Sequence, residues 1–445
     1  MKRLVILGCG ESGAGTAVLG KQQGYDVFVS DKNPIADKYK QLLNAHQIPF
    51  EEGKHTADLL LNADEVMKSP GIPEKVEIVK AIRAKGILVV SEIEFAARYT
   101  NAVLIGITGS NGKSTTTTLI HHILVKAGYK AALVGNIGFS FALAVAQGGY
   151  DYYVIEISNF QLDDIHNFRP HIAVLLNITP DHLDRYNYEM KNYVHSKFRI
   201  TENQTEKDYF IWCADNPVLQ TEMQQRTLKA QCIPFSLTTA FPIGGSIINE
   251  QLTINQPNKP TFTMSIYELA LQGKHNQHNS LAAGISANIV DVRNEIIRES
   301  MSDFENLEHR MEPVLTIKGI DFVNDSKATN INSTWFALES MTKPVIWIAG
   351  GLDKGNDYTV LQSLVKEKVK AIICMGKDNR KIHEAFARYV DMIANTQSAD
   401  EAVQMAYQLG DKGDVVLLSP ACASFDLFEN YVDRGNKFKA AVKAL

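Results

Sequence analysis

The sequence predicts an α/β protein built from three tandem domains. Its 445 residues are enough for about three domains of ordinary size. Short apolar runs alternate with helical patterns along most of the chain, which is typical of parallel sheets covered by helices. Glycine-rich or polar loops follow several of these runs. We therefore expect a Rossmann-like domain over residues 1–97, a central P-loop-type ATPase domain over 98–305 and a Rossmann-like domain over 306–445.

The composition narrows the class of protein. A hydrophobic content of 45% and a charged content of 21% are typical of globular proteins. No apolar run is long enough for membrane insertion, and the net charge of −5 argues against a nucleic-acid partner. The opening residues, with their apolar run Leu4–Leu7, are interpreted as a first strand and not as a signal peptide. Five scattered cysteines without a C-x-x-C pair are expected to be reduced core thiols of a cytoplasmic protein: Cys9, Cys213, Cys232, Cys374 and Cys422.

In the first domain, a complete G-x-G-x-x-G occupies Gly8–Gly13. Asp31 follows the next strand, at about the spacing of a ribose-binding acid. The pattern suits a dinucleotide or a nucleotide-sugar equally well. Lys68–Pro73 is either a second loop at the same sheet edge or a plain Pro/Gly turn. The expected strands are Leu4–Leu7, Val27–Ser30, Glu65–Lys68 and Ile87–Ser91, and the expected helices are Ser12–Gln23, Ile35–Ala45 and Glu74–Ala84.

The central domain opens with the strongest motif, Ile105–Thr118. An apolar run leads into T-G-S-N-G-K-S, and a helical pattern follows. Gly109 and Gly112 allow backbone N–H groups to surround an anion at a helix N-terminus. Lys113 can reach the phosphates and Ser114 can ligate Mg²⁺. Because residue 107 is Ile and not Gly, this is a shortened phosphate loop, and the alternative is an ordinary Gly-rich turn.

Later residues of this domain add a metal site. Glu156 ends the expected strand Tyr152–Ile157, where an acid can reach Mg²⁺, and His182 follows the strand His171–Asn177. By sequence alone Lys197 is an ordinary solvated lysine of the helix Tyr188–Thr201. Further expected elements are the strands Ala131–Val134, Tyr209–Cys213 and Gln231–Phe235, the helix His278–Val290 and a peripheral β-hairpin region from Phe241 to Leu269.

The third domain has polar, small-residue loops after three of its expected strands, which is where α/β folds place ligands. These loops are Asn324–Asn330, Gly350–Gly355 and Ser419–Ser424, and the strands are Ile320–Asn324, Val345–Ala349, Val369–Met375 and Val415–Ser419. A triphosphate loop, a metal site, a second nucleotide pocket and lysines at 327 and 354 suit ATP-driven activation of a carboxylate as an acyl phosphate, which an amine then attacks.

These motifs resemble those of the Mur ligases, the ATP-dependent amino-acid-adding enzymes of peptidoglycan synthesis. The resemblance covers essentially the whole chain. Its most specific parts are N-D-S-K-A-T-N at Asn324–Asn330 and L-L-S-P-A-C-A-S-F-D at Leu417–Asp426. It is carried also by Gly109–Thr115, Glu156–Leu162, Asp181–Arg185, Gly273–Asn276 and Glu308–Glu312. It implies a monomeric, cytoplasmic acid–amino-acid ligase that uses ATP, two Mg²⁺ ions, UDP-MurNAc-L-Ala and D-Glu.

The resemblance also implies roles for individual residues. The ATP set would be Gly109, Ser110, Asn111, Gly112, Lys113, Ser114, Thr115, Thr116, Asn276, Asn279, Arg310 and Asp325. The metal set would be Ser114, Glu156, His182 and a carbamoylated Lys197, and Lys113, His182, Lys197 and Lys327 would be catalytic. The UDP-substrate set would be Gly10, Ser12, Gly13, Asp31, Ser69, Asn136 and Gln161, with His182 also at its muramoyl–alanyl end. D-Glutamate would contact Thr329, Lys354, Ser424 and Tyr431.

The sequence departs from the family pattern at Asn159, Leu352 and Tyr431, where the family often has serine, an acid and phenylalanine. Two other functions suit parts of the sequence. One is an NAD-dependent dehydrogenase carrying an unrelated phosphate-loop domain, and the other is a non-catalytic nucleotide-binding regulator.

Overall fold

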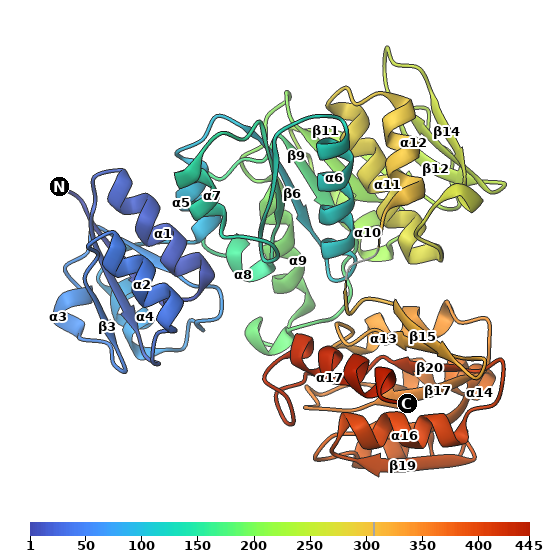
Figure 1. Cartoon of the computed structure of the whole chain (residues 1–445). Coiled ribbons are helices and arrows are strands. Elements are labelled where there is room, and N and C mark those ends of the chain that lie inside the picture. The colour runs from blue at the N-terminus through green and yellow to red at the C-terminus, as the bar shows by residue number, and fades with distance from the viewer. Residues whose placement is uncertain (306–307) are drawn as a thin grey trace. The chain divides into compact units, whose positions relative to one another are not determined.

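The protein is described by a computed structural model that covers residues 1–305 and 308–445. It forms two compact units, Met1–Gln272 with Asn276–Phe304, and Gly273–His275 with Glu305–Leu445. Three sheets with covering helices confirm the predicted α/β class (Figure 1). Residue 306, the predicted start of the third domain, lies outside the described residues. The boundary at 97–98 stays a prediction.

The first sheet is entirely parallel, with the order β3-β2-β1-β4-β5. Its strands are β1 (Arg3–Leu7), β2 (Asp26–Asp31), β3 (Phe50–Glu52), β4 (Glu65–Lys68) and β5 (Leu88–Val90). The helices are α1 (Glu11–Gln22), α2 (Asp37–Ala45), α3 (Ala57–Leu60), α4 (Glu77–Ala84) and α5 (Glu92–Ala97). Apolar residues of β1 are buried on both faces, as expected for a central parallel strand.

The second sheet has nine strands in the order β14-β13-β12-β11-β10-β9-β6-β8-β7. Its strands are β6 (Val103–Thr108), β7 (Ala131–Gly135), β8 (Tyr152–Glu156), β9 (Ile172–Leu175), β10 (Tyr209–Cys213), β11 (Gln231–Ser236), β12 (Gly244–Ile248), β13 (Gln251–Asn255) and β14 (Phe262–Ser265). Its helices are α6 (Lys113–Lys126), α7 (Phe141–Gln147), α8 (Asn159–Leu162), α9 (Met190–Phe198), α10 (Pro217–Gln225), α11 (Lys274–Ile289) and α12 (Asn294–Asp303). Because β6 lies between β8 and β9, the loops after these three strands lie at one edge.

The predicted peripheral β-hairpin region after Phe241 is confirmed: it forms antiparallel strands at one edge of the second sheet. Its pairing with the rest of the sheet was not predicted. β12 pairs in parallel with β11, and β13 and β14 continue the same sheet as antiparallel strands. Gly245 of β12 lies close to α11, since a Cβ on it would lie 2.8 Å from Ile285. The bare backbone therefore lets the helix pack directly on this strand.

The domain that contains the first sheet packs against the domain that contains the second sheet, and small residues lie at the contact. A Cβ on Gly15 of α1 would lie 1.9 Å from the hydroxyl of Ser140, the N-cap of α7. The carboxylate of Glu92, on α5, accepts hydrogen bonds from Ser140 Oγ at 2.5 Å and from the Ala142 amide at 3.1 Å. Burial raises the pKa of Glu92. The end of the first domain is thus anchored in the second.

The third sheet has the order β15-β16-β20-β17-β18-β19, in which only the β15–β16 pairing is antiparallel. Its strands are β15 (Glu312–Ile317), β16 (Ile320–Asn324), β17 (Val345–Ala349), β18 (Val369–Met375), β19 (Met392–Thr396) and β20 (Val415–Leu418). The helices are α13 (Ile331–Glu339), α14 (Gln362–Lys368), α15 (Arg380–Phe386), α16 (Ala399–Leu409) and α17 (Tyr431–Lys443). Strands β16, β20 and β17 carry the three predicted loops and are neighbours.

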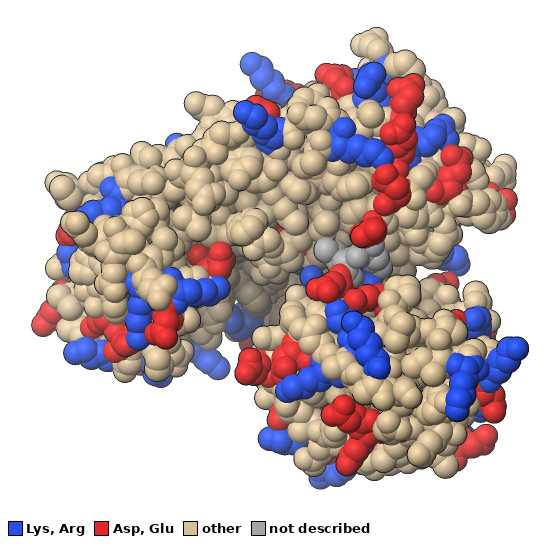
Figure 2. All heavy atoms as spheres, viewed as in Figure 1, with Lys and Arg blue, Asp and Glu red and all other residues tan. Residues whose placement is uncertain are grey.

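Basic and acidic side chains are interspersed over both units on the face shown in Figure 2, in keeping with the small net charge. No helix among the described residues is long and apolar enough to cross a membrane. The five cysteines are free, and four are buried as predicted. Cys232 is exposed, so its assignment as a core thiol is wrong.

Candidate active site

The phosphate loop joins β6 to α6. Gly109 (φ 151°) and Gly112 (φ 83°) have positive φ values, and Gly112 is the N-cap of α6. The loop is held to the segment after β9 by hydrogen bonds from the Asn111 amide to Asn177 Oδ1 (2.9 Å) and from Ser110 Oγ to the Thr179 carbonyl (2.9 Å). These contacts fix the backbone that would surround an anion.

Two lysines converge on the loop. Lys113 Nζ donates to the carbonyls of Gly109 (2.8 Å) and Ser110 (2.9 Å). Lys197, from α9, is 1% exposed, and its Nζ donates to the same Gly109 carbonyl at 3.0 Å. The interpretation of Lys197 as a solvated helix lysine is therefore wrong. Burial, together with the nearby Lys113 charge, lowers the pKa of Lys197 well below its usual value.

The start of α11 lies against the loop. A Cβ on Gly112 would lie 2.4 Å from Asn279 Oδ1, which is too close for any side chain. Asn279 and Asn276 are both buried, and Asn279 Nδ2 donates to Asn276 Oδ1 at 3.2 Å. The structure thus brings these two predicted ATP contacts to the phosphate loop.

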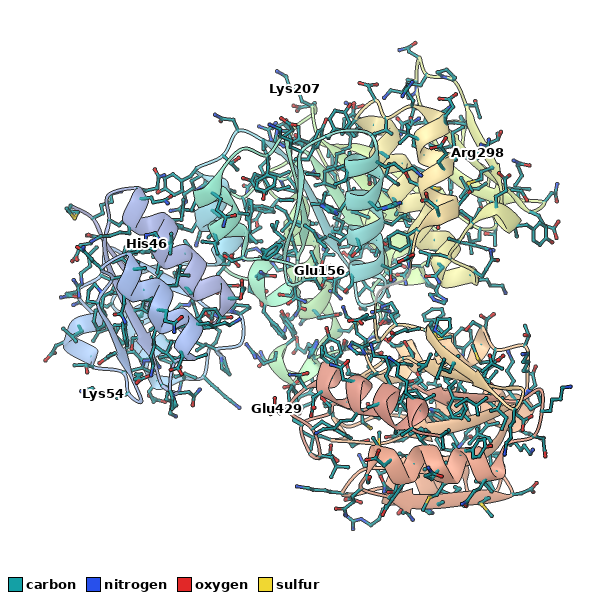
Figure 3. All side chains as sticks on the ribbon, viewed as in Figure 1. His46, Lys54, Glu156, Lys207, Arg298 and Glu429 are labelled. Carbon is teal, nitrogen blue, oxygen red and sulfur yellow. The ribbon has the colours of Figure 1, made fainter. Side chains whose placement is uncertain are left out.

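Glu156 ends β8, directly beside β6, and is labelled in Figure 3. It is 2% exposed; Oε1 accepts a hydrogen bond from Asn136 Nδ2 at 2.7 Å, whereas Oε2 is buried without a hydrogen-bond partner. A buried carboxylate oxygen is expected to be paired or bound to a metal. Ser114, at the start of α6, is also buried. A carboxylate and a hydroxyl at this edge are hard oxygen ligands that fit Mg²⁺.

His182 follows β9, the other neighbour of β6, and has a left-handed backbone (φ 51°). Its ring packs edge-on against Phe160 with the centroids 5.2 Å apart, and its Nε2 lies 3.7 Å from an Asp181 carboxylate oxygen. The prediction that it lies at the carboxyl-terminal edge of the sheet is confirmed. Its role as a metal ligand stays a prediction.

The first domain has a cavity of about 520 Å³ at the carboxyl ends of its strands. Four residues of the predicted UDP-substrate set line it: Gly10, Ser12, Asp31 and Ser69. The loop that begins with Lys68 lines the same cavity, so it is more than a plain turn. Gly13 packs on the Gly8 carbonyl, where a Cβ would lie 1.9 Å away. Asn136 lies instead beside Glu156, and Gln161 completes the capping box of α8.

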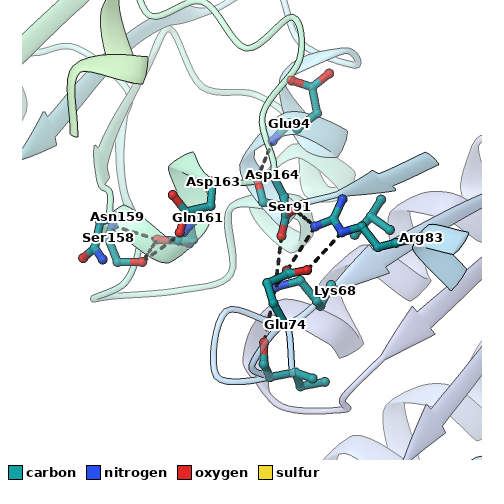
Figure 4. A network of polar contacts seen from close by, with 12 residues as sticks. Lys68, Glu74, Arg83, Ser91, Glu94, Ser158, Asn159, Gln161, Asp163 and Asp164 are labelled. Carbon is teal, nitrogen blue, oxygen red and sulfur yellow. Dashed lines mark hydrogen bonds and ion pairs between the residues drawn. The ribbon is translucent and has the colours of Figure 1, made fainter. Parts of the chain in front are cut away.

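A network of ion pairs joins the loop Lys68–Pro73, which lines this cavity, to the central domain (Figure 4). Lys68 Nζ lies 3.1 Å from Asp164 Oδ2 and 3.1 Å from Glu74 Oε1. Arg83 binds the other Asp164 oxygen at 2.5 Å and also pairs with Glu74. Lys68 and Asp164 are almost fully buried, at 3% and 2%. The network therefore links the loop that begins with Lys68 to the segment that follows α8.

In the second unit, the three polar loops are hydrogen-bonded to one another. The Ala421 amide donates to the Ala328 carbonyl (3.0 Å), the Leu352 amide to the Ala423 carbonyl (2.8 Å), and the Gly350 amide to the Pro420 carbonyl (2.9 Å). These backbone hydrogen bonds hold together the loops that follow β16, β20 and β17. The prediction that these loops share one edge is confirmed.

The predicted residues of this unit occupy different environments. Asp325 is buried and accepts a hydrogen bond from Ser419 Oγ at 2.9 Å; burial raises its pKa to about 7 despite the nearby charge of Arg310. Lys327 Nζ lies 5.6 Å from the ring centroid of Tyr431. Ser424 is buried, Lys354 is exposed, and the Thr329 amide donates to the Lys327 carbonyl.

Comparisons with known proteins match one family along the whole chain. Family models match as the MurD N-terminal domain (residues 3–78), the Mur ligase middle domain (107–287) and the Mur ligase glutamate ligase domain (309–422). The UDP-N-acetylmuramoylalanine--D-glutamate ligases of Christiangramia forsetii and Bacteroides thetaiotaomicron are 54% and 53% identical, each over 100% of both chains. The chain belongs to the Mur ligase family.

Solved structures support the Mur ligase fold. The MurC ligase of Thermotoga maritima is 15% identical, covers 100% of both chains and has a TM-score of 0.64. The MurF ligase of the same organism, solved with ADP, is 12% identical, with a TM-score of 0.61 and coverage of 100% of this chain and 98% of that one. These likenesses concern the three-dimensional arrangement of the fold.

Two groups of residues in this Mur ligase escaped sequence reasoning. Arg434, on α17, is fully buried and donates to Ser326 Oγ (3.0 Å), the Ser326 carbonyl and the Cys422 carbonyl, so it joins two of the three loops.

Asp163 accepts hydrogen bonds from Ser196 Oγ (2.5 Å) and Tyr186 OH (2.7 Å), next to Lys197. Tyr186 OH in turn accepts from Asn159 Nδ2 at 2.6 Å, which gives the departure at Asn159 a structural role. The spacing of residues along the chain does not predict these contacts, because each contact joins two elements that are separate in the sequence.

Proposed function

We propose that this Mur ligase adds D-glutamate to UDP-N-acetylmuramoyl-L-alanine with cleavage of ATP to ADP and phosphate. The single observation that carries the proposal is the phosphate loop itself. Its Gly109 carbonyl accepts from both Lys113 and Lys197, and Glu156 at the end of the neighbouring strand has an unpartnered buried oxygen. The names of the relatives that match over the full chain supply the substrates.

In this proposal the alanyl carboxylate attacks the γ-phosphorus, the bond from phosphorus to ADP breaks, and an acyl phosphate forms. The amine of D-glutamate then attacks the carbonyl carbon, the amide bond forms, phosphate leaves, and the proton lost by the amine passes to solvent. The loop amides and Lys113 offset charge on the transferred phosphoryl group. Lys327 would do the same from the second unit, so the reaction requires the loops of that unit to reach the phosphate loop.

Ser114, Glu156, His182 and Lys197 would hold two Mg²⁺ ions. The ions would supply charge neutralisation on the phosphate oxygens. Lys197 suits a carbamate because its lowered pKa favours the neutral amine. That amine attacks CO₂, a C–N bond forms, and one proton leaves to solvent. The product is a carboxylate-like group, which is a ligand for a hard cation.

The remaining assignments complete the proposal. ATP would contact Asn276, Asn279, Arg310 and Asp325 in addition to the phosphate loop. The cavity lined by Gly10, Ser12, Asp31 and Ser69 would hold the UDP end of the substrate, and Asn136, Gln161 and His182 the muramoyl–alanyl end. Thr329, Lys354, Ser424 and Tyr431 would hold D-glutamate. We also propose that the protein is a monomer and lies in the cytoplasm. Analytical ultracentrifugation would test the monomeric state.

A phosphate-release assay tests the function. With ATP, Mg²⁺ and UDP-MurNAc-L-Ala present, a panel of D- and L-amino acids should show release with D-glutamate, and Lys113→Ala should abolish it. Release with a different amino acid would overturn the assignment of the amine. Wild-type turnover in Lys113→Ala would overturn the assignment of this loop as the site that binds the ATP phosphates. The family matches contradict the alternatives of an NAD-dependent dehydrogenase and of a non-catalytic regulator.

A further inference from the structure

A second cluster of metal-ligating side chains lies where β10 meets α11. Cys213 ends β10, Asp215 follows two residues later, and His278 comes from α11. One ligand atom from each of the three lies within 4.8 Å of the other two. Among residues 1–305 and 308–445, this is the one group of three or more His, Cys, Asp or Glu side chains with such convergence. The residues of the proposed Mg²⁺ site are not part of it.

The carboxylate of Asp215 is held firmly in place. It accepts hydrogen bonds from Ser236 Oγ (2.5 Å), the Leu237 amide (2.6 Å) and Thr238 Oγ1 (3.1 Å). Its Oδ2 also lies 2.8 Å from His278 Nε2. Three of these four partners come from the end of β11 and the two residues directly after it, so the position of the carboxylate does not depend on His278. Such pre-organisation is what a ligand of a metal site requires.

The chemistry of the three ligands is selective. A thiolate and an imidazole favour borderline-soft ions such as Zn²⁺ over Mg²⁺, which prefers oxygen. Tetrahedral zinc would place its nitrogen and oxygen ligands about 3.4 Å apart. The 2.8 Å contact between His278 and Asp215 therefore needs to open by only a few tenths of an ångström. His278 and Asp215 are partly exposed, so solvent and an ion can reach the cluster while Cys213 remains buried.

We propose that Cys213, Asp215 and His278 bind a divalent transition-metal ion, for which Zn²⁺ is the best match, with the fourth position open to water. On binding, the ion replaces the proton on His278 and the thiol proton of Cys213. Both protons leave to solvent, and three ligand bonds form.

The position of the cluster gives the ion a structural effect. His278 lies between Asn276 and Asn279 on α11, and Asn279 lies against Gly112 of the phosphate loop. A metal bound at the cluster would join the end of β10 to the helix that borders the nucleotide loop. The site does not depend on the proposed ligase reaction, because no substrate takes part in it.

Cobalt titration tests the proposal on the full-length chain after chelator treatment, in an excess of Mg²⁺. Wild-type protein should bind one equivalent of Co²⁺ and show the near-ultraviolet charge-transfer absorption of a thiolate–cobalt bond. Zn²⁺ should displace the cobalt and raise the thermal unfolding midpoint. Cys213→Ser should remove the absorption and weaken cobalt binding at least about 100-fold. Loss of a residue that only supports a metal ligand already weakens binding by up to about 100-fold, and Cys213 would be a ligand itself.

Cys232→Ser is the matched control, because Cys232 is exposed on the neighbouring strand β11 and lies outside the cluster. This variant should bind cobalt as the wild type does. Asp215→Asn is the second test, with circular dichroism to establish that each variant is folded. Wild-type protein without thiolate–cobalt absorption would overturn the proposal, and so would absorption that persists in Cys213→Ser. Either result would leave His278 and Asp215 as a purely structural ion pair.

Discussion

The side-chain amines of Lys113 and Lys197 donate to one carbonyl oxygen, that of Gly109, over 2.8 Å and 3.0 Å. Burial, and secondly the charge of Lys113, lower the pKa of Lys197 well below its usual value. The phosphate loop thus brings two lysine side chains of different environment to one carbonyl. From sequence alone the two residues had no reason to be neighbours.

Replacing Lys197 with Ala should reduce kcat roughly 100- to 1,000-fold, the usual cost of removing one group that stabilises charge in a transition state. If the lysine acts as a carbamate, short carboxylic acids should restore part of the activity by occupying the space of the missing group. Phosphate release with and without added formate or acetate measures this. Absence of rescue, in a variant that still binds ATP, would contradict the carbamate.

Gly112→Ala and Gly128→Ala form a matched pair. Both glycines have similar positive φ values, 83° and 89°, so both alanines incur backbone strain of about 1–2 kcal/mol. Only Gly112 has a neighbour, Asn279 Oδ1, in the way of a Cβ, whereas Gly128 has nothing within 4 Å. Gly112→Ala should therefore also lower kcat/KM for ATP roughly 100-fold through displacement of α11. Equal kinetics in the two variants would refute the close contact.

Glu156→Gln should raise the Mg²⁺ concentration needed for half-maximal activity and lower kcat roughly 100-fold or more, since bound metal contributes several kcal/mol to phosphoryl transfer. The free energy of unfolding should not fall, because the substitution removes a buried charge with an unpartnered oxygen. Mg²⁺ titrations of activity, alongside urea denaturation, measure both effects. Glu202→Gln, at an exposed position, is the control and should behave like the wild type.

Lys68→Met should lower the free energy of unfolding by about 3 kcal/mol, because it leaves a buried carboxylate without one of its partners. The loss lies at the lower end of the range for buried pairs, since Arg83 still binds Asp164. Lys80→Met, which breaks an exposed pair with Glu77, should change it by less than about 0.5 kcal/mol. Urea denaturation of both variants provides the comparison. Equal small losses would show that the network in Figure 4 contributes little.

Much of this architecture is predictable because periodicity and loop composition are local properties. Glu65–Lys68 and Tyr209–Cys213 coincide with the observed strands β4 and β10, and the phosphate loop joins a strand to a helix as expected. What escaped depends on contacts between distant segments. The burial of Lys197 and Arg434, the pairing of β12 with β11, and the hydrogen bonds of Asn159 and Asp163 are all of this kind.

Asp325 provides a pH test. Its pKa rises from 3.8 to about 7 on folding, chiefly through burial, so between these values the folded chain keeps a proton that the unfolded chain has lost. Raising the pH through this window therefore lowers the free energy of unfolding. Asp325→Asn removes this dependence, so its stability relative to the wild type should increase steadily from about pH 4 to about pH 7. A difference that is constant with pH would contradict the raised pKa.

The contact between Glu92 and Ser140 has a practical consequence for anyone who divides this chain into fragments. A cut after residue 97 keeps Glu92 but takes away two of its hydrogen-bond donors, Ser140 and Ala142. Such a fragment would also expose Gly15 and the small-residue side of α1 to water. A useful expression boundary therefore lies beyond α7, and residues 1–97 are best purified together with the domain that carries the second sheet.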